Sequence, residues 1–490
     1  MTTTLSQHVE KRINTAAKYP VRRTAKVTIE LLTPLHIGAG DEGEISDAAV
    51  VLDANGLATI PGSSIKGVLR SAFERYADSA INVNQVFGYQ DGSQGQGSRI
   101  RVTWGRAHDQ HNKPVEGVLD PQRITTDVVL ESAATPELRD HVRIDGRGVS
   151  ENKFDDLSVA AGHRFTFRIE FVSDNGSDDK KVWSTILGIL KNAKKNPGHL
   201  RFGGKTRRGF GAVKILSIRT EHNEETDAQF SPRELLEEIA LIPDDDCFWM
   251  FGGGDDVINK DTESDSNPVR AGKVIWNDDE GEFRDNVLVI PGSSLKGPLR
   301  HRTRYHLCRR MGVWAEKATP EDQHRVNVAL SLLFGDVDLE NKGSAPDRKS
   351  PKDRVRAGCL YIDDIYLDGL DGAPAAPDSA AIQNHVTIDR ALGGAQDHHL
   401  FTDQPLHGGG FTLRIGYEQP QRLKLNKREI ELLGINPEQA ETEAVNRLAD
   451  AKAALAEAVE DLKNGLLALG AHGNRGYGWF RAADSTEPAP

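Results

Sequence analysis

The sequence is poor in cysteine, and the few cysteines it has are scattered. Its 490 residues include three, Cys247, Cys308 and Cys359, with no C-x-x-C pair among them. An odd number at irregular spacing excludes a disulfide framework and is typical of a reducing compartment. The histidines His398, His399 and His407 have no cysteine at ligand spacing, so we do not expect a structural zinc there. We expect Cys308 and Cys359 to be small core residues, not nucleophiles.

Long hydrophobic runs are also missing. No stretch approaches the length of a membrane span, and the first ten residues have no apolar core of a signal peptide. Charged residues make up 27% and hydrophobic residues 38% of the chain, an ordinary composition for a soluble protein. We therefore expect a cytoplasmic protein with no membrane partner. The length predicts two or three domains.

Positive charge is in the minority, but it is concentrated. The formal net charge is −12, yet residues 290–310 contain six basic and no acidic residues, and residues 199–216 contain five and none. Acidic residues gather elsewhere, in 221–246, 255–265 and 429–461. Basic stripes on an acidic body favour a confined track for a polyanion over a diffuse binding surface.

One motif is written twice, as I-P-G-S-S-I-K-G at 60–67 and I-P-G-S-S-L-K-G at 290–297. We interpret it as a strand end, a Pro-Gly turn and a helix start capped by serine hydroxyls. The lysine then lies in the first helical turn and an arginine follows four residues later on the same face, which suits a phosphate group. A well-capped helix with solvated bases is the alternative for a single copy. The candidate RNA-binding residues here are Ser63, Ser64, Lys66, Arg70, Ser293, Ser294, Lys296 and Arg300.

A glycine-rich loop is also duplicated, at 203–211 and 470–478. Glycines let backbone N–H groups approach a phosphate closely, although a single such loop is more often a tight turn. Beside a basic helix start in both halves, the loops favour a sugar-phosphate track and binding independent of base sequence. The candidates are Gly203, Gly204, Arg207, Arg208 and Arg475.

The two halves repeat one order of elements, which predicts two tandem α+β domains. Each half reads strand, helix, strand, an inserted excursion, strand, helix and strand, typical of a ferredoxin-like β-α-β-β-α-β core. RNA-recognition (RRM-like) modules use the same sheet as a platform. The excursions begin with H-V-R-I-D at 141–145 and H-V-T-I-D at 385–389. The three main helices are expected at 64–76, 182–190 and 445–469.

The predicted boundaries follow from the motifs. We expect an N-terminal extension at 1–23, a first domain at 24–219, an acidic linker at 220–246, a second domain at 247–482 and a tail at 483–490. The linker is expected to contain a short helix at 232–241.

Four features together resemble the repeat-associated mysterious protein (RAMP) superfamily, specifically the backbone subunits of type III CRISPR effector complexes. They are L-H-I-G-A-G-D at 35–41 with a downstream Asp, I-P-G-S-S-I/L-K-G-x-L-R, H-V-x-I-D and the terminal glycine-rich loop, over roughly residues 24–482. A tandem fusion departs from the usual one-domain subunit and resembles the type III-D branch. The resemblance implies loop and thumb-hairpin insertions, with the thumb kinking a guide–target duplex. The implied thumb residues are His141, Ile144, Asp145, His385, Ile388 and Asp389.

The same resemblance implies partners and a reaction. The partners are CRISPR guide RNA, target RNA, adjacent backbone subunits, a large signalling subunit and small subunits. Target RNA would be cut beside a loop aspartate by attack of a ribose 2′-hydroxyl on its neighbouring phosphate. The match is Asp47 in the first copy and Asp265 in the second, where Asp256 and Asp261 are alternatives. Each would also bind a divalent metal ion, Mg²⁺ or Mn²⁺, that stabilises the developing charge.

Three functions remain open at this point. The first is an RNA-guided endoribonuclease, and the second is a scaffold that only holds guide RNA. The third is a metal-independent endoribonuclease that processes repeat RNA with a histidine base. His36, which is expected to have Gly252 or a neighbour in its place in the second copy, is either such a base or a strand-end residue bonded to backbone.

Overall fold

The computed structural model describes most of the chain, and every element below belongs to that part. The described residues are 21–38, 49–78, 80–91, 94–144, 150–174, 176–221, 234–244, 247–252, 264–314, 317–337, 355–369, 376–377, 382–389, 391–392, 394–420 and 423–483. None of the helices in these ranges is both long enough and apolar enough to cross a membrane.

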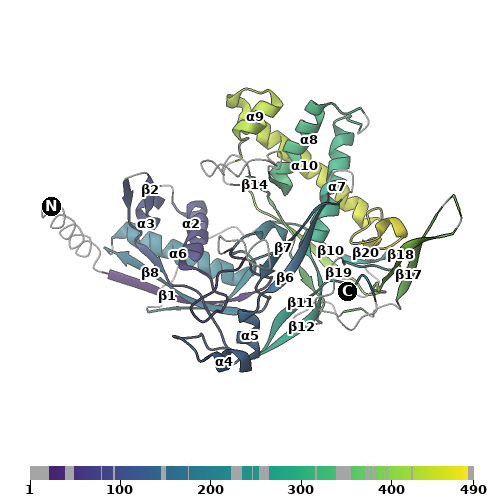
Figure 1. The fold of residues 1–490 in the computed structure, drawn as a ribbon. Helices are drawn as coiled ribbons and strands as arrows, with labels where there is room; N and C mark the ends of the chain where they lie inside the picture. Colours follow the sequence, from purple (N-terminus) through teal and green to yellow (C-terminus); the bar gives the residue numbers. More distant parts are fainter. Residues whose placement is uncertain are drawn as a thin grey trace, which may run out of the picture.

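The first domain is built on an antiparallel sheet with its first strand in the interior. The order is β4-β8-β1-β9, and the short strand β5 also pairs with β8. Helices α2 and α6 pack on each other and on this sheet (Figure 1). The elements are β1 (Val21–Leu31), α2 (Gly62–Tyr76), β4 (Ile100–Val102), β5 (Arg106–Ala107), β8 (Arg164–Ser173), α6 (Ser177–Lys195) and β9 (Val213–Thr220).

The second domain repeats this plan element by element. Its sheet has the order β15-β19-β10-β20, again antiparallel, with the first strand in the interior. The elements are β10 (Glu234–Pro243), α7 (Gly292–Arg310), β15 (Leu360–Tyr361), β19 (Phe411–Tyr417), α10 (Ala440–Lys463) and β20 (Phe480–Ala482). Both sheets therefore have the strand order of a β-α-β-β-α-β core, which confirms the prediction of two ferredoxin-like domains.

The expected helix at 232–241 is wrong, because Glu234–Pro243 is the interior strand β10. Its burial alternates, with Ile239 and Leu241 on the core side. Glutamate and leucine favour a helix locally, but pairing with β19 on one edge and β20 on the other outweighs that propensity. The second domain therefore begins within the stretch that we expected to be a linker.

Apolar side chains at sheet and helix spacing form one core in each domain. In β1 every second residue from Ala25 to Leu31 is buried, and α6 buries residues three or four apart, from Val182 to Leu190. The second core adds α8 (Pro320–Phe334) and α9 (Lys427–Leu433) to α7 and α10. Cys359 is buried in this core and Cys308 packs against it, as expected. The three predicted helices are present, and each begins before its predicted start.

Hairpins and short elements extend from the two cores. The expected thumbs are the hairpins β6 (Glu137–Ile144) with β7 (Ser150–Ser158), and β17 (Gln383–Ile388) with β18 (Ala395–Asp403). Figure 1 shows β6 and β7 between the domains, whereas β17 and β18 project away from the rest of the molecule. The remaining elements are α3 (Val83–Phe87), β2 (Tyr89–Asp91), β3 (Gln94–Gln96), α4 (Pro121–Thr126), α5 (Val128–Ala134), η1 (Thr206–Arg208), β11 (Arg270–Asn277), β12 (Glu280–Ile290), β13 (Gly335–Val337), β14 (Val355–Ala357), β16 (Ile365–Tyr366), η4 (Pro437–Gln439) and η5 (Gly473–Arg475).

The hairpin β11–β12 of the second domain lies along the first domain. The Val274 amide donates to the Ala161 carbonyl at 2.9 Å, and the Trp276 indole N–H donates to the Gly162 carbonyl at 2.7 Å. Gly162 has a φ of +85°, and a Cβ there would lie 1.9 Å from the Val274 carbonyl oxygen. Only glycine tolerates both that backbone conformation and that approach. The contact fixes the two domains against each other.

Candidate nucleic-acid interface

The duplicated helix starts are capped differently from the prediction. Pro61 and Pro291 are the N-cap residues, neither helix has a side-chain cap, and the serines follow inside the first turn. The preceding glycine has a packing role, since a Cβ on Gly62 or Gly292 would lie 2.2 Å from a carbonyl oxygen of the adjacent strand segment. The serine hydroxyls are therefore not used as caps. Ser63 lies on the surface, and Ser64, Ser293 and Ser294 are partly buried.

The two lysines of the motif lie in different environments. Lys66 is partly exposed at the start of α2. Lys296 is 8% exposed, and its Nζ donates to the carbonyls of Arg207 at 2.9 Å and Leu360 at 3.4 Å. Burial, with Arg207 nearby, lowers the pKa of Lys296 to about 7. The prediction that Lys296 contacts RNA phosphate is thus corrected: its ammonium lies inside the contact between the domains.

The paired arginines hold their helices to the following turn. Arg70 Nη1 donates to the Gly88 carbonyl at 2.9 Å, and Arg300 Nη1 donates to the Gly335 carbonyl at 3.3 Å. Arg70 also pairs with Glu74 at 3.0 Å. These bonds direct both guanidiniums toward protein acceptors, which argues against the predicted role of Arg70 and Arg300 as phosphate ligands.

The glycine-rich loops are bonded to the strand-end loops of their own domains. The Gly204 amide donates to the His36 carbonyl at 2.8 Å, and the Ala471 amide donates to the Met250 carbonyl at 2.8 Å. A Cβ on Gly203 would lie 2.2 Å from the same His36 oxygen. The Gly204 N–H is therefore already used, contrary to the prediction that it approaches phosphate. The match to His36 is Met250, two positions before Gly252, where we expected Gly252 or a neighbour.

The loop arginines divide into two groups. Arg207 pairs with Glu418 at 3.0 Å and stacks on the Tyr361 ring at 3.7 Å, and burial lowers its pKa to about 10. It belongs to the joint between the domains, which corrects its assignment to RNA. Arg208 and Arg475 lie on the surface at equivalent positions of the two loops. Together with Lys66 they are the exposed cations that the predicted track retains.

The basic stripe at 290–310 is partly neutralised by a helix that is distant in sequence. Arg302 and His306 pair with Asp461 at 2.5 Å, and Arg309 and Arg310 pair with Glu457. These acids lie on α10, which packs along α7. Three of the six cations of this stripe are therefore used in a helix–helix contact and do not belong to an open polyanion surface.

Of the aspartates predicted to take part in cleavage, Asp265 lies within the described residues, at the root of the second thumb. Asp265 is exposed, and its Oδ2 accepts from the Thr402 amide at 2.7 Å and the Thr402 hydroxyl at 3.0 Å. These two bonds fix the carboxylate at the end of β18 and leave Oδ1 for another ligand. Asp47, Asp256 and Asp261 lie outside the described residues.

Backbone pairing matches Asp265 with Asp47. The loop of the first copy is closed by the bridge between Gly38 and Val50, and that of the second by the bridge between Gly252 and Pro268. Asp47 and Asp265 each lie three residues before the closing residue. Asp256 and Asp261 do not have this position. The register therefore favours Asp265 as the counterpart of Asp47.

A metal ion at this position would have one protein carboxylate. Over the described ranges, no three His, Cys, Asp or Glu side chains come together as a ready-made metal site. Mg²⁺ is commonly held by one or two carboxylates together with phosphate oxygens of the substrate. An exposed carboxylate with one oxygen fixed by Thr402 fits that pattern.

A buried acid that the sequence reasoning missed lies beside Asp265. Asp403 is fully buried, with His385 Nε2 at 2.9 Å, His472 Nε2 at 3.6 Å and the Tyr477 hydroxyl at 3.3 Å. Burial lowers the pKa of His472, and it raises the pKa of Tyr477 to about 12. The cluster joins the thumb root, through His385, to the glycine-rich loop, through His472.

The first copy has the same arrangement with a lysine in place of the histidine. Asp156 is buried and pairs with Lys205, which occupies the left-handed position that His472 has in the second loop. His36 Nδ1 lies 2.7 Å from the Leu157 carbonyl, and burial lowers the pKa of His36. That bond supports the alternative in which His36 is a strand-end residue. A repeated Phe-x-Asp, at 154–156 and 401–403, is the sequence signal for these acids.

The other thumb residues have separate places. Ile388 is 50% exposed on β17, and Asp389 accepts from the amides of Ala391 and Leu392 in the hairpin loop. Both hydrogen bonds lower the pKa of Asp389, and the one from the Leu392 amide has the larger effect. His141 and Ile144 lie on β6, whose side chains there are outside the description, and Asp145 lies outside the described residues. His407 packs against Phe248.

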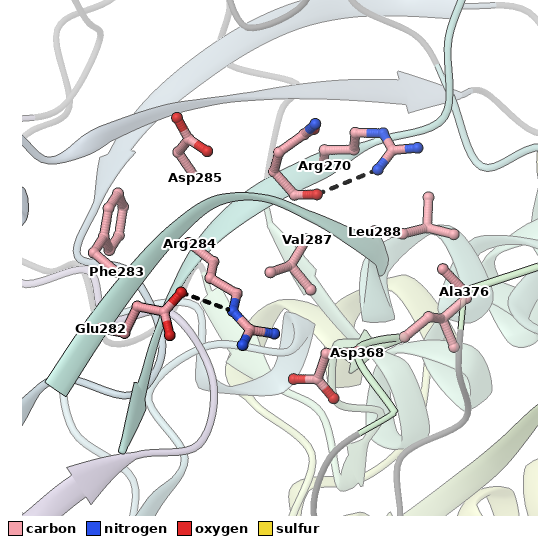
Figure 2. A pocket seen from close by; sticks show the side chains of 11 residues that line it. Arg270, Glu282, Phe283, Arg284, Asp285, Val287, Leu288, Asp368 and Ala376 are labelled. Carbon is pink, nitrogen blue, oxygen red and sulfur yellow. Dashed lines mark hydrogen bonds and ion pairs between the residues drawn. The ribbon is translucent and has the colours of Figure 1, made fainter. Parts of the chain in front are cut away.

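An open hollow of about 440 Å³ lies along β12, away from these groups (Figure 2). Its two arginines are engaged within the protein: Arg284 pairs with Glu282 at 3.4 Å, and Arg270 donates to the Asn286 carbonyl at 3.2 Å. Asp368, at its edge, pairs with Lys273. The hollow offers no free cation for a phosphate, so we do not assign RNA to it.

Comparison with known proteins agrees with the duplicated architecture. The family model of the RAMP superfamily matches residues 28–214 and again residues 249–481, once in each domain. The chain is also 28% identical over 236 residues to the protein named "CRISPR system Cms endoribonuclease Csm3" of Methanocaldococcus jannaschii. That alignment covers 43% of this chain and 88% of the relative. The two matched regions together span most of the chain, which therefore belongs to the RAMP superfamily.

Proposed function

We propose that the protein is a backbone subunit of a type III CRISPR effector complex and an RNA-guided endoribonuclease. It binds guide RNA along the sugar-phosphate backbone and cuts complementary target RNA beside Asp47 and Asp265. The observation that supports this most strongly is the matched register of the two aspartates, each three residues before the bridge that closes its loop. The similarity to a CRISPR endoribonuclease supports the same reaction class.

The described part of the site supports separate roles for a carboxylate, Asp265, and a cation, Arg475. Asp265 lies at the thumb root, and Arg475 lies on the glycine-rich loop that His472 and Tyr477 connect to that root through Asp403. Arg475 is stacked on the Phe401 ring at 4.4 Å, and we infer that it holds a backbone phosphate of the RNA. In the first copy, Arg208 takes the corresponding position, and the partly exposed Lys66 is a second cation that the second copy does not offer, because Lys296 is buried. Such contacts address backbone and not bases, so binding is independent of guide sequence.

The chemistry is a transesterification within the target strand. The 2′-oxygen bonds to the adjacent phosphorus, the bond from phosphorus to the 5′-oxygen breaks, and the products are a cyclic 2′,3′-phosphate and a 5′-hydroxyl. The 2′-hydroxyl proton is lost and the leaving oxygen gains one. A divalent ion held by Asp265 or Asp47, Mg²⁺ or Mn²⁺, would supply charge stabilisation.

The test uses the assembled effector complex with labelled target RNA. We expect the Asp47→Ala/Asp265→Ala double variant and chelation of divalent ions each to abolish cutting, with guide RNA retained. Asp261→Ala is the matched control, since it lies in the same loop without the shared register, and should cut normally. Unchanged cutting by the double variant would leave a guide-RNA scaffold as the function. Cutting that survives chelation would favour a metal-independent endoribonuclease.

A further inference from the structure

The joint between the two domains is held by arginines on one side and carboxylates on the other. Asp364, which is fully buried, pairs with Arg139, and Glu418 is shared by two arginines. A bidentate pair joins Arg201 to Asp363, with N–O distances of 2.6 and 2.7 Å. The full set is Arg75 and Arg207 with Glu418, Arg139 with Asp364 and Arg201 with Asp363. All four arginines belong to the first domain and all three acids to the second.

One aromatic ring and one lysine complete this joint. The Tyr361 ring lies 4.7 Å from the Arg201 guanidinium and 3.7 Å from that of Arg207. The Lys296 ammonium donates to the Arg207 carbonyl. Stacked and partly desolvated guanidiniums that also pair with carboxylates are more selective for their partner than exposed ion pairs are.

The repeated fold gives each acidic position a counterpart on the first domain. A Cβ on Gly62 would meet the Val102 carbonyl, and a Cβ on Gly292 would meet the Ile362 carbonyl. Val102 and Ile362 are therefore equivalent, and residues 103 and 104 of the first domain correspond to 363 and 364 of the second. The amides of Val172 and Glu418 donate to the carbonyls of Arg99 and Cys359, at equivalent strand positions. The outer face of the first domain therefore has Arg101 in place of Tyr361 and Thr103 in place of Asp363. It has Trp104 in place of Asp364 and Val172 in place of Glu418.

The arginines have counterparts on the second domain as well. Lys66 and Lys296 align the helices, the Gly204 and Ala471 amide bonds align the glycine-rich loops, and Asp156 and Asp403 align the thumbs. The second-domain face has no arginine at any of the four places. Its residues in place of Arg75, Arg139, Arg201 and Arg207 are Tyr305, Gln383, Ala468 and Asn474.

We infer that these arginine–carboxylate pairs form only between the two domains of one chain. The outer face of the first domain, which carries Arg101, Thr103, Trp104 and Val172, therefore does not bind a second copy of this chain. Stacking a second copy with the same geometry would re-form none of the four ion pairs. It would also place Trp104 where Asp364 lies, at a point where a Cβ on Gly209 would be 2.4 Å from the Asp364 carboxylate. An indole is far larger than the space that holds that carboxylate.

The first-domain face instead fits a RAMP-fold chain of different sequence. The first domain already shows how such a fold covers this kind of face on the second domain, with its glycine-rich loop and thumb root as the contacting parts. The neighbour needs no arginine there, but it needs a hollow for Trp104, which is 50% exposed. Naming a RAMP-fold neighbour rests on the proposed function, whereas rejection of a second copy rests on the joint alone. The tests below measure association and not cleavage, so the two can fail separately.

The first test introduces the residues of the internal joint at the equivalent positions of the two outer faces, the acids and the tyrosine on the first domain and the arginines on the second. One variant carries Arg101→Tyr, Thr103→Asp, Trp104→Asp and Val172→Glu, and the other carries Tyr305→Arg, Gln383→Arg, Ala468→Arg and Asn474→Arg. By sedimentation equilibrium without RNA, we expect wild type and each variant alone to remain monomeric and the mixture to form a 1:1 complex. Its association should be at least tenfold tighter than that of wild type with itself. Glutamate in place of the four new arginines is the control and should give no complex.

Two results of this test would overturn the inference. One is concentration-dependent association of wild type that Trp104→Asp abolishes. The other is a mixture of correctly folded variants, judged by circular dichroism, that stays monomeric.

A second test uses the native complex, so it does not depend on folding of the designed variants. A benzophenone amino acid in place of Trp104 is photocrosslinked in the purified effector complex, and the adduct is mapped by mass spectrometry. We expect an adduct with the glycine-rich loop or thumb root of a RAMP-fold chain of different sequence. An adduct between two copies of this chain, or with RNA alone, would overturn the inference.

Discussion

Removing the Asp364 carboxylate should destabilise the whole chain, because this acid is the most deeply buried member of the joint. Its side chain is 0% exposed, and that of its partner Arg139 is 11% exposed. Asp364 also accepts from the Gly292 amide at 2.8 Å, at the start of α7. Asp364→Ala thus leaves a buried guanidinium without its partner and a buried N–H without its acceptor.

The magnitude follows from these two losses. Breaking a buried ion pair from one side costs about 3 to 5 kcal/mol. An unsatisfied buried N–H adds about 1 to 3 kcal/mol. We therefore expect Asp364→Ala to lower the free energy of unfolding by about 4 kcal/mol or more, measured by urea denaturation of the full chain.

The matched control is an exposed ion pair of the same domain. Glu238 pairs with Arg414 at 3.0 Å, and both side chains are largely solvent-accessible, at 47% and 68%. Glu238→Ala should cost about 1 kcal/mol or less. If Asp364→Ala were no more destabilising than Glu238→Ala, the buried pair would not hold the joint, and our account of the interface would be wrong.

Three further predictions concern pH, RNA binding and glycine packing. Burial lowers the pKa of His163 from 6.5 to about 4, so the unfolded chain binds its proton first and stability falls as the pH drops from about 6.5 toward 4. His163 alone should contribute about 3 kcal/mol to that fall. His163→Gln should flatten the dependence of the free energy of unfolding on pH, measured by urea denaturation. An unchanged slope would mean that His163 is not the group responsible. Lys66→Ala should weaken guide RNA binding and reduce the slope of log binding constant against log salt concentration by about 0.7, the value per phosphate contact for a single strand. Lys296→Met should leave that slope unchanged. Equal slopes for the two variants would count against the difference in burial between the two lysines. Gly162→Ala should destabilise the chain by more than about 2 kcal/mol, because a Cβ there overlaps the Val274 carbonyl and the backbone has a φ of +85°; a near-neutral result by thermal denaturation would mean that β11–β12 does not pack on the first domain.

The sequence predicts the duplicated fold well, because period and motif order are local properties. The alternation in β8 and the helical spacing in α6 are visible in the chain itself. The strand β10 has the local signature of a helix, since E-L-L-E-E-I-A-L-I has good helix formers and its pairing with β19 comes from residues 170 or more positions away.

The site could be predicted only where its residues stay on the surface. Lys66 and Lys296 look equivalent in sequence, and only the contact between the domains buries one of them. The same contact removes Arg207 from the predicted track, and acids of α10 pair with three of the six cations in the basic stripe of α7. Such pairings depend on tertiary structure, so local charge alone overestimates the surface available to a polyanion.

The most direct measurement of the central claim is a map of cut positions in one target RNA for the two single variants. If the duplicated domains each hold one cleavage site, Asp47→Ala should remove one set of cuts and Asp265→Ala the complementary set, with the remaining cuts at wild-type positions. If either single variant removed every cut, or if neither removed any, the two domains would not be two equivalent sites and the account would be contradicted.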